Sequence, residues 1–168
     1  MTRPSEAAGA RWEEIDFEKQ LWTIPAERMK KRKEHIVPLT EQSLALLEAL
    51  KPISGHREHL FPSDRNPRTH TNSQTANMAL KRMGYGGKLV SHGLRALAST
   101  VLNEMRQDPE LIEVCLAHVD SSVRGDYNRA DYLEKRRELM SVWSQHIEHA
   151  SVGSLSASHS PTLKVVNG

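Results

Sequence analysis

The chain has 168 residues, 38% of them hydrophobic, and a formal net charge of +2, which suits one domain with a core of ordinary size. A charge this small gives no global indication of a polyanionic partner, so that indication must come from local clusters. The single cysteine excludes internal disulfides and cysteine-rich metal sites, and no apolar run reaches membrane-spanning length. We therefore expect a cytoplasmic protein without membrane contact.

The first third of the chain predicts a short helix, a small sheet and a longer helix. Residues 2–6 open a helix, with Pro4 at a position whose N–H is free. The β-prone stretches at 15–17, 21–25 and 35–39 predict an antiparallel meander, with the basic run 30–33 in its second turn. Leucines at helical spacing after residue 43 predict a helix closed by Pro52, followed by a polar loop.

The rest of the chain reads as helices. We expect helices over 72–83, ending at Gly84, and from His92 to about residue 105. Asp108-Pro109-Glu110 opens a short apolar helix that delivers His118 just past its end. A final amphipathic helix over 130–149 carries one apolar side, with Leu133, Met140, Trp143 and Ile147. The expected fold is mainly α with a small three-stranded antiparallel β-sheet, forming one domain over 1–150, with a disordered tail over 151–168.

A scattered set of polar residues suggests phosphate chemistry without a metal: Arg3, Lys30, His92, Arg95, His118 and Tyr127. An arginine guanidinium stays charged and presents a planar fork that fits two phosphate oxygens, and a tyrosine can supply the nucleophile. His92 and Arg95 stand three residues apart, which places both over the same spot on a helix. Tyr132 is a competing tyrosine.

Each of these residues also has an ordinary structural interpretation. His92 and Arg95 alone are more often a helix-start histidine and a solvated arginine, and Arg3 alone is an N-terminal surface charge. A buried tyrosine is more often a core residue, and its usual pKa near 10 makes it a poor nucleophile without cationic neighbours. The basic run is more often a solvated turn than a DNA contact.

Four segments together resemble the catalytic domain of the tyrosine recombinases, in particular prophage and genomic-island integrases. TRPSEAAGARWEEID is similar to the family's first-arginine box and MKKRKEHIVPL to its lysine hairpin. SHGLRALASTVLNE is similar to its His-x-x-Arg helix, and LAHVDSSVRGDYNRADYLEKRREL to its nucleophile segment. They occur in the family's order over nearly all of residues 1–150.

The resemblance implies a role for each site residue. Arg3 and Arg95 correspond to the arginines that clamp the scissile phosphate. Lys30 corresponds to the hairpin lysine, the general acid on the leaving 5′ oxygen, with a register counted back from Pro38 that leaves Lys31 and Lys33 nearby. His92 corresponds to the acid/base histidine and His118 to the one that hydrogen-bonds the phosphate.

Tyr127 corresponds to the nucleophile, and its spacing from His118 disfavours Tyr132. The implied reaction is site-specific DNA recombination, the integration or excision of a mobile element, through a 3′-phosphotyrosyl intermediate. Because each step exchanges one phosphoester for another, no cofactor and no metal is expected. Lys31, Arg32 and Lys33 are expected to contact DNA.

The same resemblance implies a homotetramer on two double-stranded DNA attachment sites, with a contact between protomers through the C-terminal segment, to which Trp143 and Ile147 can contribute. Packing of the last helix on the core of its own domain is an equally good interpretation of these two residues. Members of the family normally carry N-terminal DNA-binding domains and further helices before the first-arginine box, so we expect this chain alone to bind DNA weakly and not to recombine it.

Two other functions remain open at this stage. One is a non-catalytic integrase remnant that binds DNA or a partner. The other is a metal-dependent phosphoesterase using His56, His59 and His70, which ranks lower because no carboxylate set accompanies these histidines.

Overall fold

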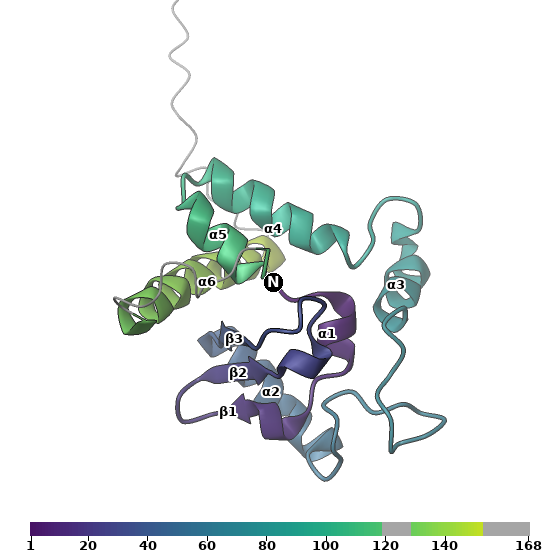
Figure 1. Ribbon diagram of the computed structural model, residues 1–168. Helices are drawn as coiled ribbons and strands as arrows, with labels where there is room; N and C mark the ends of the chain where they lie inside the picture. Colours follow the sequence, from purple (N-terminus) through teal and green to yellow (C-terminus); the bar gives the residue numbers. More distant parts are fainter. Residues whose placement is uncertain (119–128, 153–168) are drawn as a thin grey trace, which may run out of the picture.

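The computed structural model describes residues 1–118 and 129–152, with side chains in the second range from residue 132 onward (Figure 1). In chain order the elements are α1 (Pro4–Ala8), η1 (Trp12–Glu14), β1 (Ile15–Asp16), β2 (Leu21–Ile24), η2 (Ala26–Arg28), β3 (His35–Pro38), α2 (Glu41–Ser54), α3 (Thr75–Leu80), η3 (Lys81–Tyr85), α4 (Gly93–Glu104), α5 (Pro109–Cys115) and α6 (Arg129–Ser151). The expected class, mainly helical with a small three-stranded antiparallel sheet, is confirmed.

The sheet has the order β1-β2-β3 with both pairs antiparallel. Trp22 lies opposite Ile15 on one side and Val37 on the other. Side chains alternate along β2, so that Trp22 and Ile24 are buried while their neighbours are half-buried, as expected for a strand with one covered face. These two residues join the first hydrophobic cluster, in which the sheet packs against α2 through Leu44, Leu47 and Leu50.

A buried ion pair ties α1 to the sheet. The Arg28 guanidinium pairs with the Glu14 carboxylate and also donates to the Glu6 carbonyl oxygen. The Trp22 indole N–H donates to the same carboxylate at 3.0 Å. Because buried charges are tolerated only when paired and hydrogen-bonded, this network fixes the position of α1 and therefore of the residue before it, Arg3.

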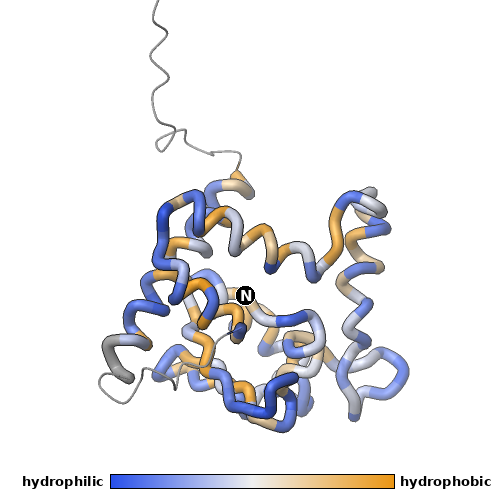
Figure 2. The backbone as a smooth tube through the Cα atoms, turned by 45° about the horizontal axis from the view of Figure 1, so that its top comes forward, coloured by the Kyte–Doolittle hydropathy of each residue, from blue (hydrophilic) through white to orange (hydrophobic). Residues whose placement is uncertain are grey.

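The three helices α4, α5 and α6 form the second layer, above the sheet in Figure 1. Leu102, Ile112, Leu116 and Leu139 are nearly inaccessible in the hydrophobic cluster at their centre. Hydrophobic and hydrophilic residues alternate along α4 (Figure 2), as expected for a helix with one buried face. Asp108 caps α5 by accepting from the Glu110 N–H at 2.8 Å.

Hydrogen bonds between distant segments join the two layers. The Arg136 guanidinium of α6 donates to the Ile36 carbonyl oxygen of β3, and Thr40 Oγ1 lies 2.8 Å from Ser144 Oγ. The chain therefore places the N-terminus, the β2–β3 hairpin and the end of α5 at the junction between the layers (Figure 1).

Most element boundaries follow the sequence prediction, with two clear differences. The helix expected over 72–83 is α-helical only over Thr75–Leu80 and continues as the π-helical η3 to Tyr85. Helix α2 does not close at Pro52 but continues to Ser54. Pro52 removes only one hydrogen bond from the last turn, and the buried Ser54 fixes that turn by donating to the Leu60 carbonyl at 2.7 Å while its own carbonyl accepts from Trp12. Gly84 has the left-handed φ of 90° that its predicted helix-ending role requires.

The expected tail over 151–168 begins within the last turn of α6 and lies, from residue 153, outside the described residues. In the part of the chain that the structure describes, no helix is both long and apolar enough to cross a membrane.

Candidate active site

Arg95 is the most buried of the predicted site residues that the structure describes. It lies in the first turn of α4, and only 6% of the residue is exposed. Its guanidinium donates to the Leu116 carbonyl oxygen at 2.7 Å and to the Met1 carbonyl oxygen, and one of its nitrogens lies 3.3 Å from His118 Nε2. These bonds draw together the N-terminus, α4 and the end of α5, so Arg95 stands at the centre of the layer junction.

Arg3 lies close enough to Arg95 for the two charges to interact. Arg3 Nη1 forms a 2.7 Å ion pair with Glu6, whose side chain is only 2% exposed, and the Arg3 backbone N–H donates to the other oxygen of that carboxylate. Burial, and then the charge of Arg3, lower the pKa of the Arg95 guanidinium below its ordinary value. Two guanidinium groups held this close favour the binding of an anion between or beside them.

His118 follows α5 in a turn that fixes its backbone. The His118 N–H donates to the Glu113 carbonyl at 3.0 Å, the Ala117 N–H donates to Val114, and Ala117 has a φ of 53°. This pair of bonds around a left-handed residue is the Schellman ending of a helix. It brings Glu113 and His118 together, and His118 Nδ1 lies 3.0 Å from Glu113 Oε2.

The hairpin lysines differ in their contacts. Lys31 Nζ donates to the His118 carbonyl oxygen, which places the β2–β3 hairpin against the end of α5. Lys30, the predicted general acid, is exposed beside it, as are Arg32 and Lys33. Arg32 has a φ of 50° within this tight turn. The structure thus brings Lys31 to His118 and leaves Lys30 one residue away at the surface.

His92 lies at the N-cap of α4, one turn before Arg95. Its side chain is exposed, whereas that of Arg95 is buried. The spacing of three residues places both near the same end of the helix, but their side chains occupy different environments. His92 is therefore positioned at the rim of the site, whereas Arg95 is buried at its centre, with Arg3 and the half-exposed His118 beside it.

The predicted nucleophile, Tyr127, lies in the segment 119–128, outside the described residues. The competing tyrosine, Tyr132, packs against the cluster of α4, α5 and α6. Burial, followed by the charges of Glu110 and Asp108, raises the pKa of its hydroxyl above the ordinary value. A raised pKa makes the phenolate harder to form, so Tyr132 suits a structural role better than nucleophilic attack.

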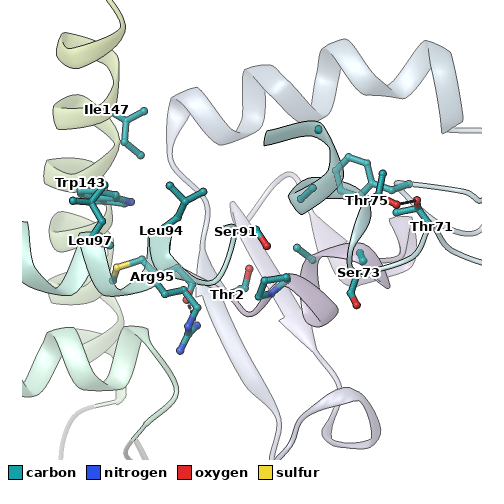
Figure 3. Close-up of a pocket in the computed structure, with 18 of the residues that line it drawn as sticks. Thr2, Thr71, Ser73, Thr75, Ser91, Leu94, Arg95, Leu97, Trp143 and Ile147 are labelled. Atoms are coloured by element: carbon teal, nitrogen blue, oxygen red, sulfur yellow. Dashed lines mark hydrogen bonds between the residues drawn. The ribbon is translucent and has the colours of Figure 1, made fainter. Parts of the chain in front are cut away.

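An apolar pocket of about 810 Å³ adjoins Arg95, between α1, α3, α4 and α6. Figure 3 shows Leu94 and Leu97 of α4 beside Trp143 and Ile147 of α6 on one side of the pocket, near Arg95, with Thr71, Ser73 and Thr75 on the other side. The apolar side predicted for the last helix is therefore divided: Met140 is buried and Trp143 packs against the core, but Ile147 is 50% exposed at the pocket.

The histidines of the metal-dependent alternative do not form a ligand set. The His59 and His70 rings meet edge to face at 5.4 Å, an aromatic contact. Within residues 1–118 and 129–152, no group of three or more His, Cys, Asp or Glu side chains is placed to hold a metal ion.

Two contacts at the site were not predicted from the sequence. The Glu113 carboxylate contacts the His118 ring, and the Lys31 ammonium donates to the His118 carbonyl oxygen. A helix ending just before His118 was expected, but the pairing with Glu113 depends on the left-handed conformation of Ala117, a residue type that rarely adopts it. A glycine at that position would have indicated the turn.

Comparison with known proteins gives a consistent result. Residues 1–134 match the Phage integrase family. The chain is 53% identical over 167 residues to the prophage integrase IntA of Escherichia coli K12, covering 99% of this chain and 40% of that protein. It is 39% identical over 163 residues to the integrase of Enterobacteria phage P4, covering 87% of this chain and 37% of the other.

The chain thus spans about two fifths of the length of these curated relatives. Among solved structures, it is similar to the XerA recombinase, with a TM-score of 0.56 and 16% sequence identity, over 88% of this chain and 52% of that one. At this identity the likeness establishes the fold, and the family is established by the matches in sequence.

Proposed function

The chain belongs to the phage integrase family, and we propose that it is the catalytic part of a tyrosine-type site-specific DNA recombinase, which integrates or excises a mobile element. The observation that carries this proposal is the pair of guanidinium groups at the layer junction. Arg95 is buried, and its pKa is lowered by burial and by the charge of Arg3. A phosphodiester bound there would compensate the charge of Arg95, which no carboxylate hydrogen bond in the described residues cancels, and would do so more strongly as negative charge develops in the transition state.

In the proposed reaction, the Tyr127 oxygen attacks the phosphorus of a DNA phosphodiester. A bond forms between the tyrosine and the 3′ phosphate, and the bond to the 5′ oxygen breaks. We assign proton donation to that leaving oxygen to Lys30 and removal of the tyrosine proton to His92. His118 hydrogen-bonds the phosphate, and a 5′ hydroxyl from a partner strand then reverses the step. The energy of the phosphoester is retained in the covalent intermediate.

Trapping on a nicked suicide substrate tests this proposal. A nick near the cleavage position lets the short fragment that carries the new 5′ hydroxyl diffuse away, so that the step cannot reverse. The protein then remains attached to DNA and migrates more slowly on a denaturing gel. We expect Tyr127→Phe to abolish the adduct and Tyr132→Phe, the matched control, to retain it. An adduct lost only in Tyr132→Phe would overturn the nucleophile assignment. A chain that binds the site without ever forming an adduct would instead be a non-catalytic DNA-binding remnant.

Arg95→Lys separates charge from geometry in the same assay. Lysine keeps the positive charge but lacks the planar fork that can hold two oxygens. We expect this variant to lose most of the trapping rate. The trapping rates of Lys30→Ala and Lys31→Ala show in the same way which of the two hairpin lysines donates the proton. Equal trapping by Arg95→Lys and the wild type would remove Arg95 from the phosphate clamp.

We also propose that the partner is a double-stranded DNA attachment site, contacted by Lys31, Arg32 and Lys33, and that four protomers assemble on two such sites in the cytoplasm. The exposed Ile147 beside the apolar pocket supports a contact between protomers, since exposed apolar patches commonly mark interaction surfaces. Sedimentation of the DNA complex tests this assembly: Ile147→Asp should reduce its mass, and an unchanged mass would exclude Ile147 from the contact.

A further inference from the structure

We propose that Glu113 is a positioning residue for His118: its carboxylate holds Nδ1 of the imidazole, so that Nε2 points to the place where the phosphate binds. This inference rests on the proposed function for the role of His118, but the orientation of the ring can be tested without DNA. It concerns a residue at the end of α5 that takes no direct part in the proposed chemistry.

The two nitrogens of the His118 ring face groups of opposite polarity. Nδ1 lies 3.0 Å from Glu113 Oε2, and Nε2 lies 3.3 Å from a guanidinium nitrogen of Arg95. A carboxylate can only accept a hydrogen bond and a guanidinium can only donate one. In the neutral ring, the proton must therefore be on Nδ1, and Nε2 accepts from Arg95.

Backbone contacts also support this arrangement. His118 and Glu113 are joined by the backbone hydrogen bond of the Schellman turn as well as by their side chains. Lys31 holds the His118 carbonyl from the other side. In many such turns the corresponding two positions make a hydrophobic contact; here a carboxylate and an imidazole occupy them. The side chains are 43% and 47% exposed, so Glu113 holds a ring whose other edge stays open to a ligand.

The chemical consequence concerns the arriving phosphate. When the ring carries two protons, it donates from Nδ1 to Glu113 and from Nε2 to a phosphate oxygen that also contacts Arg95. The carboxylate keeps the ring in the orientation that this requires. Without Glu113, the ring can rotate about its χ torsions and exchange between tautomers.

Nitrogen-15 NMR of histidine-labelled protein is the direct test, with the His118 resonances assigned by their loss in His118→Gln. We expect the wild type at neutral pH to show the Nδ1–H tautomer. Glu113→Gln should retain it, because the amide oxygen can still accept the Nδ1 proton and so keep Nε2 facing Arg95. Glu113→Leu, which is similar in size and has no acceptor, leaves the ring free to rotate away from Arg95 and should show a mixture of tautomers. An unchanged spectrum in Glu113→Leu would overturn the proposal.

Covalent trapping then measures the functional effect. We expect Glu113→Leu to slow adduct formation by about 10- to 100-fold, by analogy with the loss found when the carboxylate that orients a metal-binding histidine is removed. Glu113→Gln should lose much less, and Glu104→Leu, which removes an exposed carboxylate at the end of α4, serves as the control for charge. Equal slowing by Glu104→Leu and Glu113→Leu would reduce the effect to a loss of surface charge.

The two parts of the experiment separate the two proposals. If the wild-type chain forms no adduct, the proposed function fails, but the spectra of the Glu113 variants still decide whether Glu113 positions the ring. If the adduct forms and Glu113→Leu alters neither the spectrum nor the rate, the positioning role fails and the proposed function stands.

Discussion

His35 should make the stability of the protein depend on pH. Burial, followed by the nearby charge of Arg136, lowers the pKa of this imidazole from its ordinary 6.5 to about 4. Glu6 acts in the opposite direction, and the ring also bonds to the Cys115 backbone. Because the folded state resists protonation of His35, the unfolded state binds more protons between these two pH values. Its contribution is therefore complete above pH 6.5 and is lost as the pH falls toward 4.

The size of the effect follows from the two pKa values. Between pH 7.5 and pH 4.5, a group with a pKa of 6.5 when unfolded and about 4 when folded lowers the free energy of unfolding by about 2.5 kcal/mol. Other groups titrate in the same range, so the informative quantity is the difference between the wild type and His35→Gln, measured by urea denaturation at several pH values. We expect the variant to lose about 2.5 kcal/mol less than the wild type over this interval.

His56→Gln is the matched control, since it removes an exposed imidazole from the loop after α2. It should keep the pH dependence of the wild type. Parallel curves for the wild type and His35→Gln would refute the reasoning, because they would mean that the ring is protonated equally in the folded and unfolded states.

Three further predictions test the local structure at and near the site. Ala117→Gly should leave the free energy of unfolding unchanged or raise it by about 0.5 kcal/mol, because relief of the left-handed strain is partly offset by the greater freedom of glycine in the unfolded chain. Ala117→Val should lower it by more than about 1 kcal/mol. Equal stabilities of the glycine and valine variants would contradict the φ of 53° at this position. Thr40→Ala removes the N-cap of α2 and the bond to Ser144 and should cost about 1 to 2 kcal/mol in urea denaturation, with exposed Thr69 as the control position. Inorganic phosphate at about ten times its dissociation constant should stabilise the wild type by about 1.4 kcal/mol relative to chloride of equal ionic strength, and Arg95→Gln should abolish this difference in thermal denaturation.

Much of the fold is predictable because its signals are local. The helix ends at Pro4, Asp108 and Gly84 each follow from a backbone requirement that one residue type satisfies. The three strands follow from β-prone stretches separated by polar turns. The extension of α2 beyond Pro52 could not be predicted in this way, because tertiary hydrogen bonds of Ser54 hold the last turn.

The environment of the site residues is less predictable, because it depends on which side of a helix faces a second layer. The spacing of His92 and Arg95 places them near the same end of α4, yet it does not say that the first is exposed and the second buried. Likewise, the sequence predicts a single apolar side for the last helix. In the structure Met140 is buried in the core, whereas Ile147 lies at the pocket, where no described element of the chain covers it.

The pairing of the arginines explains why the site suits an anion from outside. Arg3 is compensated by Glu6 and Arg28 by Glu14, in each case through a carboxylate. In the described part of the chain, the hydrogen bonds of Arg95 go instead to two carbonyl oxygens and a ring nitrogen. Neutral acceptors orient a guanidinium without cancelling its charge, so Arg95 is held in place and still positive. Burial strengthens the field of that charge, and a phosphate reaching the junction would meet a donor whose orientation is already set by the fold.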